Sequence, residues 1–221
     1  MADQAPPSVD PADLGDMAGM FRALFRKYEM QHHDMLPATV IAYDRVSNRA
    51  TIKPMIQQIT TTDQAVSRAG VASVPVFQFG GGGFMVSVPI KPGDRGWIKA
   101  ADRDISLFMA SNQESVPNTL RARDFSDSMF YPDVLFDFTI DGDDTERLTI
   151  QSLDATTKIS VGDGSIKCLV SGVGFEVTSD GVNFIGGKVT HDGTVIDKTH
   201  IHSQGSDSHG DSEVDTGGPH A

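Results

Sequence analysis

The sequence has one cysteine, one tryptophan and three tyrosines among 221 residues. The single cysteine, Cys168, excludes an intramolecular disulfide, which is typical of proteins that fold in a reducing cytoplasm. No run approaches the roughly 18 uncharged apolar residues of a transmembrane helix. The N-terminus also lacks the basic and then apolar pattern of a secretory signal peptide. We therefore expect synthesis and folding in a cytoplasm.

Positive charge is scarce as well. The chain has 18 Lys and Arg and 30 Asp and Glu, which give a formal net charge of −12. The sequence contains no cluster of basic residues. Proteins that neutralise the phosphates of nucleic acids or of anionic membrane surfaces need clustered Lys and Arg. We therefore expect no nucleic-acid partner and no attraction to a membrane by charge.

The composition favours a mainly β fold. The chain has 22 glycines, and its hydrophobic content is 38%. Many glycines with few large apolar residues indicate short strands joined by turns rather than a few long helices.

One amphipathic helix is nevertheless predicted at about 8–33. Asp10 suits the N-cap and Pro11 the first helical position. We expect this helix to pack on its own domain or, alternatively, to dock on a partner. His32 and His33 follow it and are expected to be solvated. The apolar residues at three- and four-residue spacing are Leu14, Met17, Ala18, Phe21, Leu24, Phe25 and Tyr28.

A small β-barrel of the OB type is predicted at 36–112, because five strands in about 75 residues suit such a barrel. The four glycines at 80–83 are followed by neither Lys-Ser nor Lys-Thr, so they do not predict a phosphate-binding loop. Few cations accompany the aromatic residues of these strands, which favours a scaffold over an oligonucleotide-binding barrel. The five expected strands lie at 39–43, 50–56, 72–79, 84–90 and 96–99.

The next segment, 113–145, has no clear period and is predicted to be a linker. It ends in the acidic run DGDDTE at 141–146. This run lacks the ligand spacing of a calcium-binding loop, so a solvated turn is expected.

Short alternating strands dominate 146–198. Glycine-containing turns separate them, and no helical pattern is available to cover their apolar faces. The apolar positions are Leu148, Ile150, Ile159, Val161, Ile166, Cys168, Val170, Val173, Phe175, Val177, Val182 and Phe184.

A single sheet of this size is marginal in water, and its open edges would invite uncontrolled pairing. Three copies wound about a threefold axis would direct every apolar face into a shared thin core. The sequence therefore predicts an intertwined, trimeric β-helix. A monomeric sandwich is the alternative, although Phe175 and Phe184 are the only bulky inward residues and suit a narrow tube better.

Two histidines follow these strands. His200 and His202 are two residues apart, so on an extended strand both imidazoles point the same way. Three chains supply six nitrogens, which match an octahedral first-row metal. Imidazole suits iron, nickel, copper or zinc, and a six-nitrogen shell disfavours zinc. Iron is the first choice among these metals. A catalytic metal would need further ligands on a rigid scaffold, and a chain without any metal is the other alternative. We expect a structural site, no catalytic residues and no enzymatic activity.

Several motifs carry a family resemblance. They are VPIKPGDRGW at 88–97, DRDIS at 102–106 and RDFSDSMFYP at 123–132 in the first half, with THIH at 199–202 and TGGP at 216–219 near the end. With these motifs the chain resembles the central spike, or membrane-piercing, proteins of contractile-tailed bacteriophages that have a gp138-like N-terminal domain. The resemblance covers most of the chain, but it assigns no role to the N-terminal helix.

The resemblance implies a homotrimer at the tip of a contractile tail baseplate, assembled in the host cytoplasm. An OB collar would lie beneath the tail tube and contact the baseplate hub and tail tube proteins. A triple-stranded β-helix would pierce the bacterial outer membrane on sheath contraction, and His200 and His202 of three chains would bind iron at its apex. A trimeric receptor-binding fibre or adhesin is the alternative function, and a metal-dependent hydrolase is a more distant one.

The expected organisation has five parts. The fold class is mainly β, with a helix at one end and a metal-bound apex at the other. The parts are an N-terminal helical segment at 1–35, an OB-fold collar at 36–112, a linker at 113–145, a trimeric β-helix at 146–198 and an apex with the His-x-His site at 199–221.

Overall fold

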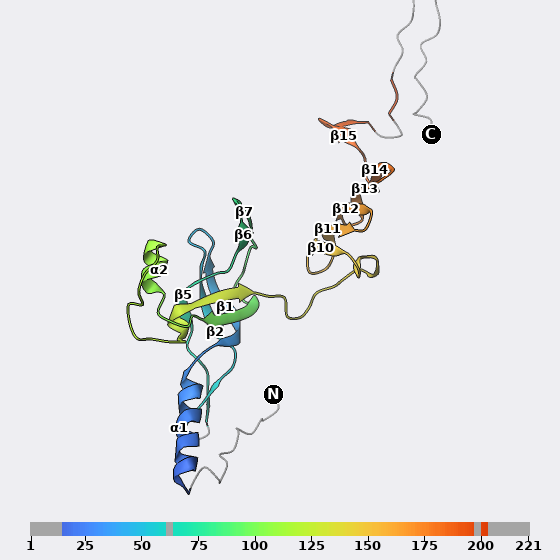
Figure 1. Cartoon of the computed structure of the whole chain (residues 1–221). Coiled ribbons are helices and arrows are strands. Elements are labelled where there is room, and N and C mark those ends of the chain that lie inside the picture. Colours follow the sequence, from blue (N-terminus) through green and yellow to red (C-terminus); the bar gives the residue numbers. More distant parts are fainter. Residues whose placement is uncertain (1–14, 61–63, 197–199, 203–221) are drawn as a thin grey trace, which may run out of the picture. The chain divides into compact units, whose positions relative to one another are not determined.

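The computed structural model describes residues 15–60, 64–196 and 200–202, and it divides the chain into two compact units between Leu135 and Phe136. Figure 1 shows an N-terminal helix followed almost entirely by strands. The predicted mainly β fold class is therefore confirmed. Each unit is described separately below.

Helix α1 spans Met17–Gln31, and it begins later than the sequence pattern indicated. Asp16 is its N-cap, with an extended backbone and a carboxylate that accepts a hydrogen bond from the Gly19 N–H at 2.5 Å. This bond satisfies one of the N–H groups that a helix start leaves without a partner. The predicted cap Asp10 and Pro11 lie outside the described residues.

The main sheet of the first unit has five strands in the order β5-β2-β1-β8-β9, and all neighbours are antiparallel. The sheet curls until its two edges meet, because Val76 forms a parallel bridge with Phe130 and the Phe77 N–H donates to the Phe130 carbonyl at 2.8 Å. The result is a partly closed five-stranded barrel. Its strands are β1 (Met35–Asp44), β2 (Arg49–Pro54), β5 (Val71–Pro75), β8 (Arg95–Ala100) and β9 (Ser128–Pro132).

Two strands differ from those predicted for this barrel. The run at 84–90 does not join the main sheet, since β7 (Phe84–Val86) pairs with β6 (Phe79–Gly81) in a separate hairpin. Its place is taken by β9, which lies in the segment predicted to be a linker. Phe130 in the centre of β9 is completely buried, whereas Phe84 is 85% exposed, so β9 supplies the core that the earlier run does not.

The core of the barrel lies inside the curled sheet. Alternate residues of β1, β2 and β8 point inward, as the period of a strand requires. Gly96 is needed at one close approach, because a Cβ there would fall against the Tyr131 carbonyl and the Phe130 ring. The buried apolar residues are Ala38, Val40, Ala50, Ile52, Val74, Val76, Ile90, Ile98, Ala100, Phe125 and Phe130.

A network of ion pairs and hydrogen bonds stabilises the loop between strands β8 and β9. Arg121 pairs with Asp104 at 3.2 Å and with Asp127 at 2.9 Å, and both carboxylates are nearly buried. The Thr119 hydroxyl also donates to Asp104, at 2.6 Å. Smaller elements around this loop and the sheet are β3 (Gln58–Ile59), β4 (Ala65–Val66), α2 (Ser106–Ser111) and the 3-10 helix η2 (Phe125–Asp127).

The second unit contains a five-stranded antiparallel meander, in which each strand pairs with the next. These strands lie where the alternating pattern predicted them. They are β10 (Leu148–Gln151), β11 (Thr157–Gly162), β12 (Ser165–Val170), β13 (Val173–Thr178) and β14 (Gly181–Ile185), followed by the separate hairpin of β15 (Thr190–His191) and β16 (Thr194–Val195).

The acidic run before β10 is not the solvated turn that the sequence predicted. It forms the 3-10 helix η3 (Gly142–Asp144), and Asp144 at its end is only 2% exposed. The Asp144 carboxylate pairs with the Lys158 ammonium and accepts a hydrogen bond from the Ser160 hydroxyl at 2.5 Å. A buried carboxylate needs such partners, which only the folded meander brings to it.

Candidate association surface and metal site

Two rows of apolar side chains cross all five strands of the meander. The cross-strand register places the residues of each row directly opposite one another, and the two rows are two residues apart along every strand, so they share one face. The first row is Ile150, Ile159, Cys168, Phe175 and Phe184. The second row is Leu148, Val161, Ile166, Val177 and Val182. We call this the double-row face.

The double-row face is not covered by the described part of the chain. Nine of its ten side chains are exposed, from 36% for Val177 to 70% for Leu148, and Cys168 is half-buried. Contiguous apolar surface of this kind marks an interaction site, since it is rare on the surface of a soluble monomer. Burying one Val, Ile or Phe side chain completely contributes about 1.5–3 kcal/mol. Covering the whole face would therefore contribute more free energy of association than polar contacts at the surface usually do.

The opposite face of the meander is mainly polar, although Leu169 and Ile185 also lie on it, and several of its charged side chains form ion pairs. Lys158 lies between Asp144 and Asp141, and Lys167 lies 3.7 Å from Glu176. The hydrogen bond from Lys158 and that from Ser160 hold the pKa of Asp144 below its ordinary value, and the same pairing raises the pKa of Lys158. The two faces therefore differ sharply in chemistry, and only the double-row face calls for a covering partner.

One arginine on the polar face, Arg147, links several of its polar residues. The Arg147 guanidinium donates to the Ser160 hydroxyl at 2.6 Å and to the Ser165 hydroxyl at 3.0 Å, and it lies 3.5 Å from Asp144. Arg147 thereby ties η3 to strands β11 and β12.

The two predicted metal ligands are brought together by the structure. The Nε2 atoms of His200 and His202 are 3.0 Å apart, and the two rings are perpendicular, with centroids 4.4 Å apart. His200 Nδ1 lies 2.7 Å from the Val195 carbonyl oxygen. Because a carbonyl can only accept, Nδ1 carries the proton in this contact, and Nε2 keeps the lone pair that a metal needs.

The 3.0 Å contact has the length of a hydrogen bond between the two imidazoles, and it is also compatible with neighbouring positions on an octahedral metal. Two nitrogens bound at about 2.1 Å and at a right angle are about 3.0 Å apart, whereas tetrahedral ligands at the same bond length are about 3.4 Å apart. Among the described residues, no group of three or more His, Cys, Asp or Glu side chains could hold a metal. The pair thus provides part of a coordination shell, and completing it requires donors from elsewhere. Asp207, His209 and His220 lie outside the described residues.

The other described histidines lie elsewhere in the sequence and have different surroundings. His191 lies at the end of strand β15, and its side chain is 81% exposed. His32 and His33 are half-buried, which corrects the prediction that both are solvated. The His33 ring stacks on Phe125 with centroids 4.5 Å apart, because the chain after α1 passes against the barrel.

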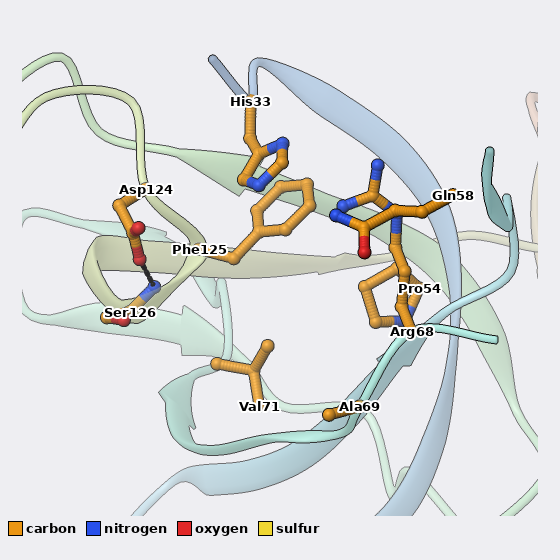
Figure 2. A pocket seen from close by; sticks show the side chains of 9 residues that line it. All are labelled: His33, Pro54, Gln58, Arg68, Ala69, Val71, Asp124, Phe125 and Ser126. Atoms are coloured by element: carbon orange, nitrogen blue, oxygen red, sulfur yellow. Dashed lines mark hydrogen bonds between the residues drawn. The ribbon is translucent and has the colours of Figure 1, made fainter. Parts of the chain in front are cut away.

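A pocket of about 190 Å³ lies beside this stacked pair (Figure 2). Its lining comes from several separate segments, which is why no sequence motif indicated it. Burial and the nearby Arg68 lower the pKa of His33. The lining residues are His33, Pro54, Gln58, Arg68, Ala69, Val71, Asp124, Phe125 and Ser126.

A family comparison accounts for the first unit. Residues 36–133 match the family model of the phage protein Gp138 N-terminal domain. The match covers fewer than half of the 221 residues, and it shows that this part of the chain is similar to that family. The matched residues run from β1 to the end of β9 and include nearly all of the curled sheet. No curated protein matches the chain.

The phage family indicates a virion component. The barrel motifs that carried the resemblance all lie within the matched residues. None of the described helices is long and apolar enough to span a membrane.

Proposed function

We propose that this chain is the central spike of a contractile phage tail. Three copies form a needle at the tip of the baseplate, and the needle pierces the host outer membrane when the sheath contracts. The Gp138 N-terminal domain supports a phage tail component. The observation that carries the proposal is the uncovered double-row face of the meander.

The shape of this face favours three copies. Two rows separated by two residues span about 7 Å along the strands, while five strands span about 19 Å across the sheet. A face this narrow suits one side of a thin three-sided prism, in which each sheet turns its apolar rows toward the axis. Such a prism buries all three faces at once, and its long axis runs across the strands.

The histidine pair supports the same symmetry. Three chains bring six imidazole nitrogens to one axis, and the 3.0 Å spacing within each pair suits an octahedral ion. We propose that His200 and His202 of three chains bind one iron ion. The ion would supply a structural crosslink, while the Val195 carbonyl fixes the His200 ring with Nε2 directed away from it.

A metal crosslink at this end has a mechanical purpose. Chain termini are where a fold frays first, and a ligand that binds only the assembled state stabilises it. The Gp138 N-terminal domain would form the OB collar beneath the tail tube, in contact with baseplate hub and tail tube proteins. The proposed action is mechanical, by concentrating the force of contraction, and involves no catalysis.

One experiment tests the trimer and the ion together. We expect a solution mass of three times the 23.7 kDa chain and one iron ion per three chains. Cys168 lies in the first apolar row, and because it is the single cysteine of the chain, its thiol reports directly on that face. The thiol should react slowly with a thiol reagent until denaturant is added. A folded monomer with a rapidly reacting Cys168 would contradict the proposal.

A further inference from the structure

Helix α1 has an apolar side that the described part of the chain leaves uncovered. Met17, Phe21, Leu24 and Tyr28 are each more than half exposed. The expectation that this helix packs on its own domain is therefore wrong for the described residues. A helix of 15 residues is marginal in water without tertiary packing, so this side requires a partner.

The spacing of these side chains indicates what kind of partner fits. Met17, Phe21, Leu24 and Tyr28 follow one another at intervals of four, three and four residues, which is the seam of a coiled coil. Met20 and Phe25 widen the seam on either side. At 100° per residue, the six side chains fall within an arc of about 140°.

The opposite side of α1 carries more polar residues, although Met30, which is 61% exposed, also lies there. Arg22, Arg26 and Glu29 lie outside the apolar arc, as the same angular spacing shows. In a pair of helices each helix meets one neighbour and buries a narrow seam. In a bundle of three each helix meets two neighbours, so a wider arc is buried. The width of the α1 arc therefore fits three helices better than two.

We propose that three copies of α1 pack as a parallel three-helix bundle and form a second association surface of the chain. This inference rests on the proposed trimer, which brings three copies of the helix together in the same direction. Only three residues, 32–34, connect α1 to β1. So short a connection keeps the three helices at an effective concentration of at least about a millimolar, which favours their pairing over capture of a separate partner.

Cysteine pairing tests the bundle in the full chain. Leu24 lies within the apolar arc, and its sequence neighbour Ala23 lies outside it and is exposed. We expect Leu24→Cys to form disulfide-linked chains under mild oxidation with diamide. Ala23→Cys should remain largely unlinked. The parent chain, with Cys168 alone, gives the background.

The outcomes separate this inference from the proposed function. Leu24→Cys linking no better than Ala23→Cys, in a protein that still has the trimer mass, would overturn the bundle and leave the spike intact. A monomer mass for the parent chain would instead contradict the trimer on which both rest.

A second pair of variants tests the bundle without a crosslink, in case Leu24→Cys links chains that only collide. Leu24→Asp should lower the helical circular dichroism signal of the trimer, because the charge breaks the packing that stabilises α1. Ala23→Asp should retain most of that signal. Equal signals from the two variants would also overturn the bundle.

Discussion

Phe175 of β13 lies directly opposite Phe184 of β14, and the two rings are 37% and 60% exposed. A directly opposed aromatic pair stabilises a sheet by up to about 1 kcal/mol. This gain is small compared with the free-energy cost of leaving so much apolar surface exposed to water. Both residues belong to the first apolar row, together with Cys168. They become core residues only when other sheets cover the face.

A charge on the double-row face should therefore break the assembly. We expect Val177→Asp to weaken trimer formation at least about 100-fold, because each trimer would bury three carboxylates without partners. Thr178→Asp is the matched control, since Thr178 is the next residue of β13 and points to the other face. Sedimentation across a concentration series measures both variants. Equal weakening by the two would show that the face is not the interface.

Removing the histidine pair should release the ion without unfolding the chain. We expect His200→Ala with His202→Ala to reduce bound iron to background and to lower the thermal midpoint. Each kcal/mol lost would lower that midpoint by about 2–8 °C. His191→Ala should keep both the iron and the midpoint, because His191 is a solvated residue. Iron retained by the double variant would exclude these residues as ligands.

The regular features of the fold were readable from the sequence, and the reason is their period. Strands β10 to β14 alternate apolar and polar residues strictly, so their positions and their shared face follow from spacing two. The pairing of His200 and His202 follows from the same spacing. What the spacing could not show is what covers this face, because the alternation identifies an apolar face but not its partner.

Strand β9, which the sequence analysis did not predict as part of the barrel, has no strict alternation of apolar and polar residues. Strand β9 is short, begins with Ser128 and ends with Pro132, and its partner β8 lies far upstream in the sequence. The run at 84–90 has the stronger apolar pattern but forms an exposed hairpin instead. Asp144 was missed for a related reason, since an acidic run resembles a solvated turn until the fold brings Lys158 against it.

The buried carboxylate gives a stability prediction. We expect Asp144→Asn to lower the free energy of unfolding by about 3 kcal/mol, because it leaves the buried Lys158 ammonium without its nearest counter-charge. Asp143→Asn changes the neighbouring residue, which is exposed, and should shift stability by less than about 0.5 kcal/mol. Urea unfolding of the two variants measures the difference. Similar values would show that the η3 network does not stabilise the meander.

The same network predicts a dependence on pH. Hydrogen bonds from Lys158 and Ser160 lower the pKa of Asp144 in the folded chain, so the unfolded chain binds the proton first as the pH falls. The contribution of Asp144 should be complete above the ordinary carboxyl range of about 4 and should be lost below it. The stability gap between the parent and Asp144→Asn should therefore narrow from pH 7 to pH 3. A gap that stays constant would contradict this origin.

The closure of the barrel depends on a position that admits no side chain. Gly96 of β8 faces the Tyr131 carbonyl and the Phe130 ring of β9 so closely that an added Cβ would displace one of them. We expect Gly96→Ala to lower the free energy of unfolding of the first unit by about 2 kcal/mol or more. Gly81→Ala is the control, because nothing lies within 4 Å of a Cβ at that position in β6. Hydrogen exchange should show faster opening of β8 and β9 in Gly96→Ala alone. Unchanged exchange there would mean that the pairing of β8 and β9 tolerates the displacement.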